Sequence, residues 1–356
     1  MADATDLKGD VIVRREGSAG IIRLNRPKAI NALTLEMVRV IAAALDRFET
    51  DPAVALVLLE GAGERGLCAG GDIRGLYESS RAKGDLGKIF WREEYVVNAR
   101  IAKFAKPYVA FMDGLVMGGG VGLSAHGRHR IVTEKTRLAM PEAGLGFFPD
   151  VGGTWLLSRA PGELGTYFGL TGQTMNGPDA IHARFADAVV PTEKLPVLRD
   201  LLTKVRPGVL SSEVQTLIAG FATGETAGPV AALQSRIDGW FARDSMQDIV
   251  AALAHDGSDL AASTLKTLNE KSPRGMVVTL KLLRLARASS SLEECLRREY
   301  RAALAVFASD DFREGVRAAV IDKDRNPRWS PPRIEDVTPE MLAPYFAEIG
   351  PDELVF

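Results

Sequence analysis

The chain has 356 residues, of which 46% are hydrophobic and 25% are charged, and its formal net charge is −2. This composition indicates a globular protein of one large or two modest domains and excludes a broadly basic surface for nucleic acid or anionic membranes. Because no apolar run approaches the length of a membrane span and the polar first ten residues lack a targeting pattern, we expect a soluble, cytoplasmic protein with no membrane partner.

Short apolar runs alternate with helical patterns through the first part of the chain. Strand-length runs fall at residues 11–15, 21–24, 54–59, 107–112 and 131–132. Apolar residues recur at helical spacing over 35–48, with Thr34 as the expected N-cap, and helices are also expected at 90–104 and 118–125. This alternation predicts an α/β architecture.

The pattern changes beyond about residue 195. From there to about residue 345 the signals are mostly helical, interrupted by Pro207, Pro229 and Pro273. We therefore predict an α/β core over residues 1–194, followed by a helical C-terminal region over residues 195–356.

Metal and thiol chemistry find little support in the sequence. Cys68 and Cys295 lie far apart, and neither they nor the four histidines match a metal-ligand spacing. We expect two reduced thiols and neither a metal nor a redox cofactor. Any chemistry must then depend on carboxylates and on backbone groups.

The segment Gly61–Gly66 fits the GxGxxG fingerprint of dinucleotide-binding proteins and follows an expected strand. That fingerprint requires a helix to begin at the third glycine. Here Gly70 and Gly71 follow and oppose helix propagation, and no second strand ends in an acidic residue about twenty positions on. The sequence therefore argues against a nicotinamide-dependent oxidoreductase.

Two glycine-rich turns each follow an expected strand. Gly70 and Gly71 lie in the first, and Gly118 to Gly122 form the second, which leads into a helix. Backbone N–H groups at glycine are open to a ligand, and two that converge on a carbonyl oxygen can stabilise an oxyanion. Tight turns and close helix packing explain such glycines equally well.

Carboxylates in apolar surroundings are the other candidates. Glu142 follows Met140-Pro141, and Asp150 follows Phe147-Phe148-Pro149. Such surroundings raise a carboxyl pKa, which suits a nucleophile or a general base. As structural alternatives, Glu142 is a first-turn helix residue and Asp150 is an N-cap. Glu94, taken alone, has the pattern of a solvated helix residue.

Together these motifs resemble the crotonase (enoyl-CoA hydratase/isomerase) superfamily. The resemblance rests on Cys68–Asp72, Met117–Leu123 and Met140–Glu142, and on the N-terminal pattern Asn25-Arg26-Pro27 with Asn31-Ala32-Leu33. It implies an α/β fold with a crotonase-like core of stacked ββα turns and a helical C-terminal region. It also implies an acyl-CoA thioester whose carbonyl oxygen lies between the N–H groups of Gly71 and Gly119.

One position separates the branches of this superfamily. Hydratases that resemble this sequence carry a glutamate two residues after the triple glycine, and here that residue is Gly122. The chain is instead similar to the 3-hydroxyisobutyryl-CoA hydrolase branch. The matching segments are residues 67–74, 92–95, 117–124, 139–142, 148–153, 170–172, 271–273, 299–301, 311–318, 321–324 and 327–329.

This resemblance implies hydrolysis of a short 3-hydroxyacyl-CoA, as in valine catabolism, with Glu142 and Asp150 as catalytic residues beside Gly71 and Gly119. Glu94, Gly119, Glu142 and Asp150 are the implied substrate-binding positions. Coenzyme A is part of the substrate, so no separate cofactor is expected. Relatives often assemble as trimers or hexamers, which makes a homo-oligomer an expected state. The alternatives are an enoyl-CoA hydratase or isomerase and a non-catalytic acyl-CoA-binding protein.

Overall fold

Three segments of chain build each of two structural units in the computed structural model, which describes residues 9–356. Unit 1 contains the described residues up to Gly71 together with Val96–Leu138 and Met175–Ala231. Unit 2 contains Asp72–Tyr95, Ala139–Thr174 and Ala232–Phe356. The prediction that the first ten residues carry no targeting segment concerns mainly residues 1–8, which lie outside the described part of the chain.

A six-stranded sheet forms the framework of unit 1. Its strand order is β1-β2-β3-β5-β7-β9, with β1 antiparallel to β2 and the other neighbours parallel. The strands are β1 Val11–Glu16, β2 Ala19–Leu24, β3 Leu56–Gly61, β5 Tyr108–Met112, β7 His129–Val132 and β9 Ala188–Val189. The central strands are apolar on both faces, as expected for parallel strands covered on both sides.

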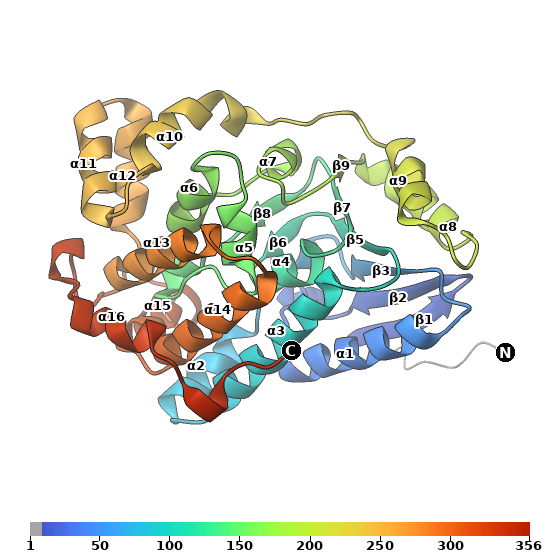
Figure 1. Ribbon diagram of the computed structural model, residues 1–356, viewed down its shortest axis with the longest axis horizontal. Coiled ribbons are helices and arrows are strands. Elements are labelled where there is room, and N and C mark those ends of the chain that lie inside the picture. Colours follow the sequence, from blue (N-terminus) through green and yellow to red (C-terminus); the bar gives the residue numbers. More distant parts are fainter. Residues whose placement is uncertain (1–8) are drawn as a thin grey trace. The chain divides into compact units, whose positions relative to one another are not determined.

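Helices pack on the two faces of this sheet (Figure 1). On one face, Ile21 and its neighbours contact α8 (Leu195–Leu202) and α9 (Ser211–Ala219). Gly20 points to the opposite face, where a Cβ atom would lie 2.6 Å from the Phe48 ring of α1 (Leu35–Thr50). The expected cap of α1 is confirmed, since the Thr34 side chain accepts a hydrogen bond from the Met37 N–H.

A second, three-stranded sheet has the order β4-β6-β8. Its strands are β4 Gly66–Cys68, β6 Leu115–Met117 and β8 Arg137–Ala139, and the short helix α4 (Gly119–Ser124) follows β6. The third glycine of the GxGxxG segment, Gly66, thus begins a strand and not a helix. The rejection of a dinucleotide fingerprint is confirmed.

Unit 2 is mainly helical. Its helices are α2 Ile73–Arg81, α5 Gly153–Ser158, α6 Leu164–Thr171, α10 Gln234–Phe241, α11 Met246–Asp256, α12 Asp259–Asn269, α13 Pro273–Arg287, α14 Leu292–Phe307, α15 Asp310–Val316 and α16 Pro339–Phe346. Helix α3 (Leu86–Ala102) begins in unit 2 and ends in unit 1, and α7 (Gly177–His182) belongs to unit 1. Short 3-10 or π turns occur at Pro27–Ala29, Glu142–Leu145 (η2), Thr192–Lys194, Pro229–Leu233, Arg317–Ile321, Ile334–Asp336 and Gly350–Asp352.

The predicted helical character beyond residue 195 is therefore present in the structure. The units nevertheless interleave along the chain, which a division at residue 194 did not anticipate. Residues 195–231 belong to unit 1 because the apolar faces of α8 and α9 pack on its sheet. Residues 139–174 belong to unit 2, where α13 packs on α5 and α6.

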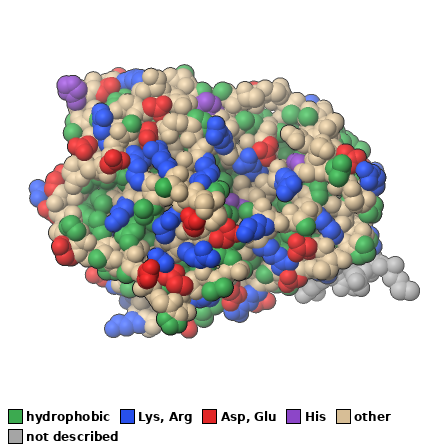
Figure 2. All heavy atoms as spheres, in the orientation of Figure 1, with side chains coloured by type: hydrophobic (Ala, Val, Ile, Leu, Met, Phe, Trp, Pro, Cys, Tyr) green, Lys and Arg blue, Asp and Glu red, His purple; other side chains and the backbone are tan. Residues whose placement is uncertain are grey.

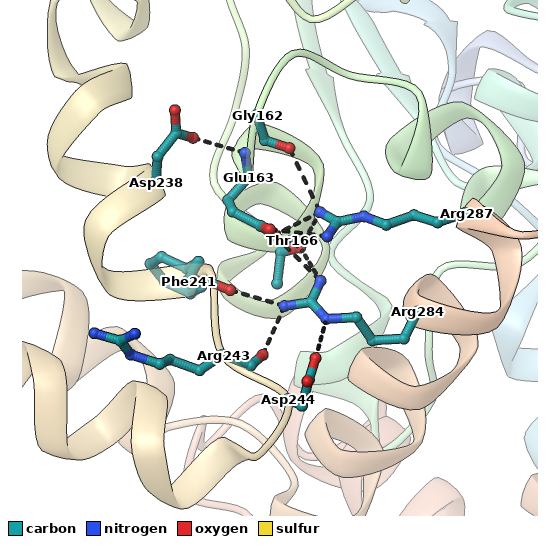
Figure 3. Close-up of polar contacts among 9 residues, drawn as sticks. All are labelled: Gly162, Glu163, Thr166, Asp238, Phe241, Arg243, Asp244, Arg284 and Arg287. Carbon is teal, nitrogen blue, oxygen red and sulfur yellow. Dashed lines mark hydrogen bonds and ion pairs between the residues drawn. The ribbon is translucent and has the colours of Figure 1, made fainter.

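An ion-pair network around a buried carboxylate ties three helices of unit 2 together (Figure 3). Glu163, at the start of α6, pairs with Arg287 (2.6 Å) and Arg284 (3.2 Å) of α13. Its N–H donates to the Asp238 carboxylate of α10 at 2.7 Å. This buried carboxylate is therefore neutralised by two guanidinium groups, which is the usual arrangement for a buried charge.

Charges of both signs are interspersed on the molecular face shown in Figure 2, where Lys and Arg side chains alternate with Asp and Glu. Within residues 9–356, no helix is both long and apolar enough to cross a membrane.

Candidate active site

The first glycine turn of unit 1 is held in place by buried side-chain and backbone contacts. The Asn31 amide, which is fully buried, donates to the carbonyl oxygens of Gly66 (3.2 Å) and Leu67 (3.0 Å). The Leu33 N–H donates to the Gly70 oxygen at 2.8 Å. These contacts explain the Asn31-Ala32-Leu33 pattern in the sequence, because that segment fixes the turn that presents Gly71.

The second glycine turn lies directly beside the first, because β4 and β6 are paired. A Cβ atom on Gly70 would lie 3.7 Å from the Gly119 nitrogen, and one on Gly120 would lie 2.8 Å from Cys68 Cβ. Gly118 has φ of 47°, which favours glycine. The close-packing interpretation is therefore right for Gly120.

The N–H groups of Gly71 and Gly119 have a different part to play from the close packing at Gly120 Cα. In the chain from residue 9 onward, neither N–H donates to a protein acceptor. Gly119 is the first residue of α4, where a backbone N–H has no partner within the helix. Two adjacent turns with unused N–H groups can accept a negatively charged oxygen, which is what the oxyanion-hole prediction requires.

The three predicted carboxylates come together within unit 2. Glu94 lies on α3, Glu142 begins η2 and Asp150 precedes α5. Their exposed fractions are 2%, 8% and 6%, respectively, and two oxygens, Glu94 Oε1 and Glu142 Oε2, accept no hydrogen bond from residues 9–356. The first-turn position expected for Glu142 is correct. Asp150 is not an N-cap, because Gly152 occupies that position in α5.

Burial dominates the electrostatics of this cluster. It raises the pKa of Glu94 well above its ordinary value, and the charges of Asp150 and Glu142 add to the rise. Burial likewise raises the pKa of Glu142, with Asp150 next in importance. For Asp150, burial raises the pKa to about 7. Unlike Glu163, none of the three has a cationic partner among the described residues, so protons must neutralise part of the cluster.

Two further residues complete the cluster and were not assigned a role from the sequence. The Tyr95 hydroxyl donates to Asp150 Oδ2 at 2.7 Å. Glu299 of α14 is fully buried and accepts from the N–H groups of Gly152 (2.7 Å) and Thr154 (3.0 Å). These contacts join residues that lie 55 to 147 positions apart, so sequence spacing could not reveal them. The sequence indicated a role for these two residues only in that both lie in segments that match the hydrolase branch.

Comparison with known proteins defines the family. The model of the family described as Enoyl-CoA hydratase/isomerase matches residues 19–346, which is most of the chain. The chain belongs to this family.

Curated relatives are similar over the whole chain. The 3-hydroxyisobutyryl-CoA hydrolase, mitochondrial, of Homo sapiens is 40% identical over 362 residues, covering 100% of this chain and 93% of that protein. The protein of the same name from Bos taurus is 41% identical, with coverage of 100% and 93%. Because these names include the word mitochondrial, the relatives do not support the predicted cytoplasmic location.

Solved structures of the family confirm the predicted crotonase-type fold. A carnitinyl-CoA dehydratase from Mycobacterium thermoresistibile has a TM-score of 0.91 and 45% identity, covering 98% of this chain and 99% of that chain. An enoyl-CoA hydratase from Rhodobacter sphaeroides has a TM-score of 0.89 and 43% identity, covering 98% and 100%. Relatives at similar identity thus carry names of different reactions, so the site residues must decide between them.

The electrostatics of Glu94 predict a stability effect in this family member. A raised pKa means that the folded protein holds the proton more tightly, so stability falls as pH rises from the ordinary carboxyl range toward the folded-state pKa. Glu94→Gln removes this cost. We expect the variant to match wild type near pH 4 and to be the more stable of the two near pH 8.

Urea unfolding at the two pH values measures this difference. Glu78→Gln, at an exposed position on α2, is the matched control and should change stability at neither pH. Equal destabilisation of Glu94→Gln at both pH values would contradict the electrostatic account.

The Tyr95 hydrogen bond predicts a shift in the pH profile. Because this bond stabilises ionised Asp150, it lowers the pKa of that carboxyl, and Tyr95→Phe should raise it further above about 7. If ionised Asp150 supports turnover, the acid limb of kcat/KM moves to higher pH by on the order of one unit. Tyr108→Phe is the control, because Tyr108 is also buried but donates to the Leu123 oxygen in unit 1. An unshifted limb in Tyr95→Phe would show that Asp150 does not set it.

Proposed function

We propose that the chain hydrolyses the thioester of 3-hydroxyisobutyryl-CoA, or of a similar short 3-hydroxyacyl-CoA, to the free acid and CoA. The observation that carries this proposal is the composition of the site. Glu142 and Asp150 lie in one buried cluster, and neither has a cationic partner among the described residues. The position of the second hydratase glutamate is Gly122, which is buried and has no side chain. The full-length similarity to proteins named 3-hydroxyisobutyryl-CoA hydrolase supports the same reaction.

In the proposed reaction, the N–H groups of Gly71 and Gly119 hold the thioester oxygen as negative charge develops on it. Glu142 then acts in one of two ways. Its carboxylate attacks the carbonyl carbon, CoA thiolate leaves and water hydrolyses the resulting anhydride, or it removes a proton from a water that attacks directly. Both routes consume one water and yield one acid and one CoA thiol.

The unsatisfied oxygens of Glu94 and Glu142 suggest how the acyl group is selected. A buried acceptor without a donor costs about 1–3 kcal/mol, and a hydroxyl on the substrate can supply that donor. An acyl group without the hydroxyl leaves the acceptor unpaired, so discrimination should be strong. This reasoning supports a 3-hydroxyacyl group, with Glu94 and Asp150 as the contacts that orient the hydroxyl or the water.

A hydratase is the second candidate, because two structures at 43–45% identity are named as an enoyl-CoA hydratase and a carnitinyl-CoA dehydratase. Those names describe addition or loss of water at a carbon–carbon bond. With Gly122 in place of a carboxylate, a hydratase with two glutamates would lack one of them. We therefore rank thioester hydrolysis first.

Free-thiol release from a panel of thioesters tests the proposal. We expect kcat/KM to be highest for 3-hydroxyisobutyryl-CoA, lower for 3-hydroxypropionyl-CoA and lowest for crotonyl-CoA and acetyl-CoA. Equal rates across the panel would refute selection by the hydroxyl. Absence of thiol release from every member would refute the hydrolase and leave hydration or simple acyl-CoA binding.

The proposed reaction also implies a metabolic role, a cofactor requirement and a partner. The reaction would serve valine breakdown, and its only cofactor-like group is the CoA moiety of the substrate. The acyl-CoA is the proposed small-molecule partner, and a homo-oligomer stays a prediction.

A further inference from the structure

A fourth carboxylate, Glu299, lies beside the cluster and has no part in the proposed reaction. Its side chain is fully buried in the middle of α14, where an ionisable group is costly unless it is hydrogen-bonded. It receives three donors: the Gly152 N–H, the Thr154 N–H and the Thr154 hydroxyl. All three belong to the turn that carries Asp150 into α5.

That turn has an unusual backbone. Val151 has φ of 53° and Gly152 has φ of 77°, so two successive residues lie in the left-handed region. For a β-branched residue such as valine this conformation is strained and persists only when its surroundings fix it. The hydrogen bonds that Gly152 and Thr154 donate to Glu299 fix the residues that follow Val151. A backbone hydrogen bond, from the Gly153 N–H to the Asp150 carbonyl oxygen at 2.6 Å, closes the turn.

The neighbouring residue on α14 reaches Asp150 by a separate route. The Tyr300 ring packs edge-to-face on Tyr95 with centroids 6.3 Å apart, and Tyr95 donates its hydroxyl to Asp150. Both aromatic side chains are fully buried. Adjacent residues of α14 thus contact both the turn that follows Asp150 and the tyrosine that donates to its carboxyl group.

We propose that Glu299 is a positioning residue of the proposed hydrolase site, which fixes the turn carrying Asp150 and controls the charge on that carboxyl group. The kinetic consequence of this inference rests on the proposed function, whereas its electrostatic consequence rests on the hydrogen bonds and burial of Glu299 and Asp150. Burial raises the pKa of Glu299 to about 7, close to that of Asp150, and the negative charge of Glu299 adds to the rise at Asp150. Ionisation of Glu299 therefore opposes ionisation of Asp150.

The titratable groups that interact electrostatically with these two carboxyl groups lie on α3, η2 and α14. They are Glu94 and Tyr95 of α3, Glu142 of η2, and Cys295 and Arg298 of α14. Arg298 is the one cation among them, and its charge lowers the pKa of Glu299, which favours the ionised form there rather than at Asp150. Glu299 also has three hydrogen-bond donors, whereas the Asp150 side chain has the Tyr95 hydroxyl.

The test is the titration of Asp150 in the intact protein, followed by NMR of ¹³C-labelled carboxyl groups without substrate. Glu299→Gln removes a negative charge beside Asp150, so the Asp150 midpoint should fall by on the order of one pH unit. The matched control is Glu163→Gln, which removes another buried carboxylate of unit 2 and should leave the Asp150 midpoint unchanged. An unchanged midpoint in folded Glu299→Gln overturns the proposal.

A second variant guards against a simple loss of folding. Thr154→Val removes one donor and keeps the Glu299 charge, so the Glu299 midpoint should rise while the fold is retained. If Thr154→Val leaves the Glu299 titration unchanged, the hydrogen bonds do not control that carboxyl and the proposal fails.

The pH dependence of kcat/KM distinguishes a positioning role of Glu299 from a purely structural one. In Glu299→Gln the acid limb of kcat/KM should move to lower pH, opposite to the shift expected for Tyr95→Phe, with kcat reduced more than KM is changed. A uniform loss of activity with an unshifted limb would indicate a structural role only. If no acyl-CoA is hydrolysed by wild type, the proposed function fails, and the substrate-free titration still decides the electrostatic role of Glu299.

Discussion

Glu142→Gln is expected to lower kcat for thioester hydrolysis by about a thousandfold or more, because both proposed routes require the carboxylate as nucleophile or base. The amide keeps the size of the side chain and the first-turn position in η2. Binding of a non-hydrolysable thioether analogue, measured by calorimetry, should change little. Near-normal turnover in this variant would remove Glu142 from the reaction.

Isotope transfer distinguishes the two routes through Glu142. If the carboxylate attacks the carbonyl, repeated turnover in ¹⁸O-water should introduce label into the Glu142 side chain, detectable by mass spectrometry of the peptide that contains it. If Glu142 acts as a base, the label appears only in the acid product. A labelled Glu142 therefore requires an anhydride that water opens at the Glu142 carboxyl carbon, and an unlabelled one excludes that form of the route.

Gly119→Pro is expected to lower kcat by about a hundredfold to a thousandfold, the usual cost of losing one oxyanion donor. Proline has no N–H, yet it is well tolerated at the first position of a helix, which is where Gly119 lies in α4. The variant should therefore keep its fold, as judged by circular dichroism and thermal unfolding. Stopped-flow measurement of thiol release gives kcat.

Gly119→Ala is the matched control for this prediction, because it adds a Cβ atom but keeps the N–H. We expect it to retain far more activity than the proline variant. Equal losses in the two variants would indicate that space at Gly119 matters and that its N–H does not.

Much of the local structure was predictable because it follows from the order of residues along the chain. The apolar spacing after Thr34 and its capping hydroxyl predicted α1, and two glycines after Gly66 argued against a helix there. The crotonase motifs identified Gly71, Gly119, Glu142 and Asp150 as candidates, and the structure brings the two glycine turns together in one unit and the carboxylates in the other.

The surroundings of Asp150 could not be derived in the same way. Its hydroxyl partner Tyr95 lies 55 residues before it, and the carboxylate that holds its turn, Glu299, comes from α14. Which buried carboxylates lack a cation also depends on tertiary packing: Glu163 meets Arg284 and Arg287, whereas Glu94 meets other acids. Sequence spacing carries no information on such contacts. The interleaving of the two units was missed for the same reason.

The most direct test of thioester hydrolysis is the stoichiometry of free thiol released per 3-hydroxyisobutyryl-CoA consumed, with enoyl absorbance recorded in the same cuvette. We predict one thiol per substrate molecule and no rise in enoyl absorbance. Consumption of the substrate with rising enoyl absorbance and no thiol would contradict the account and identify the chain as a dehydratase.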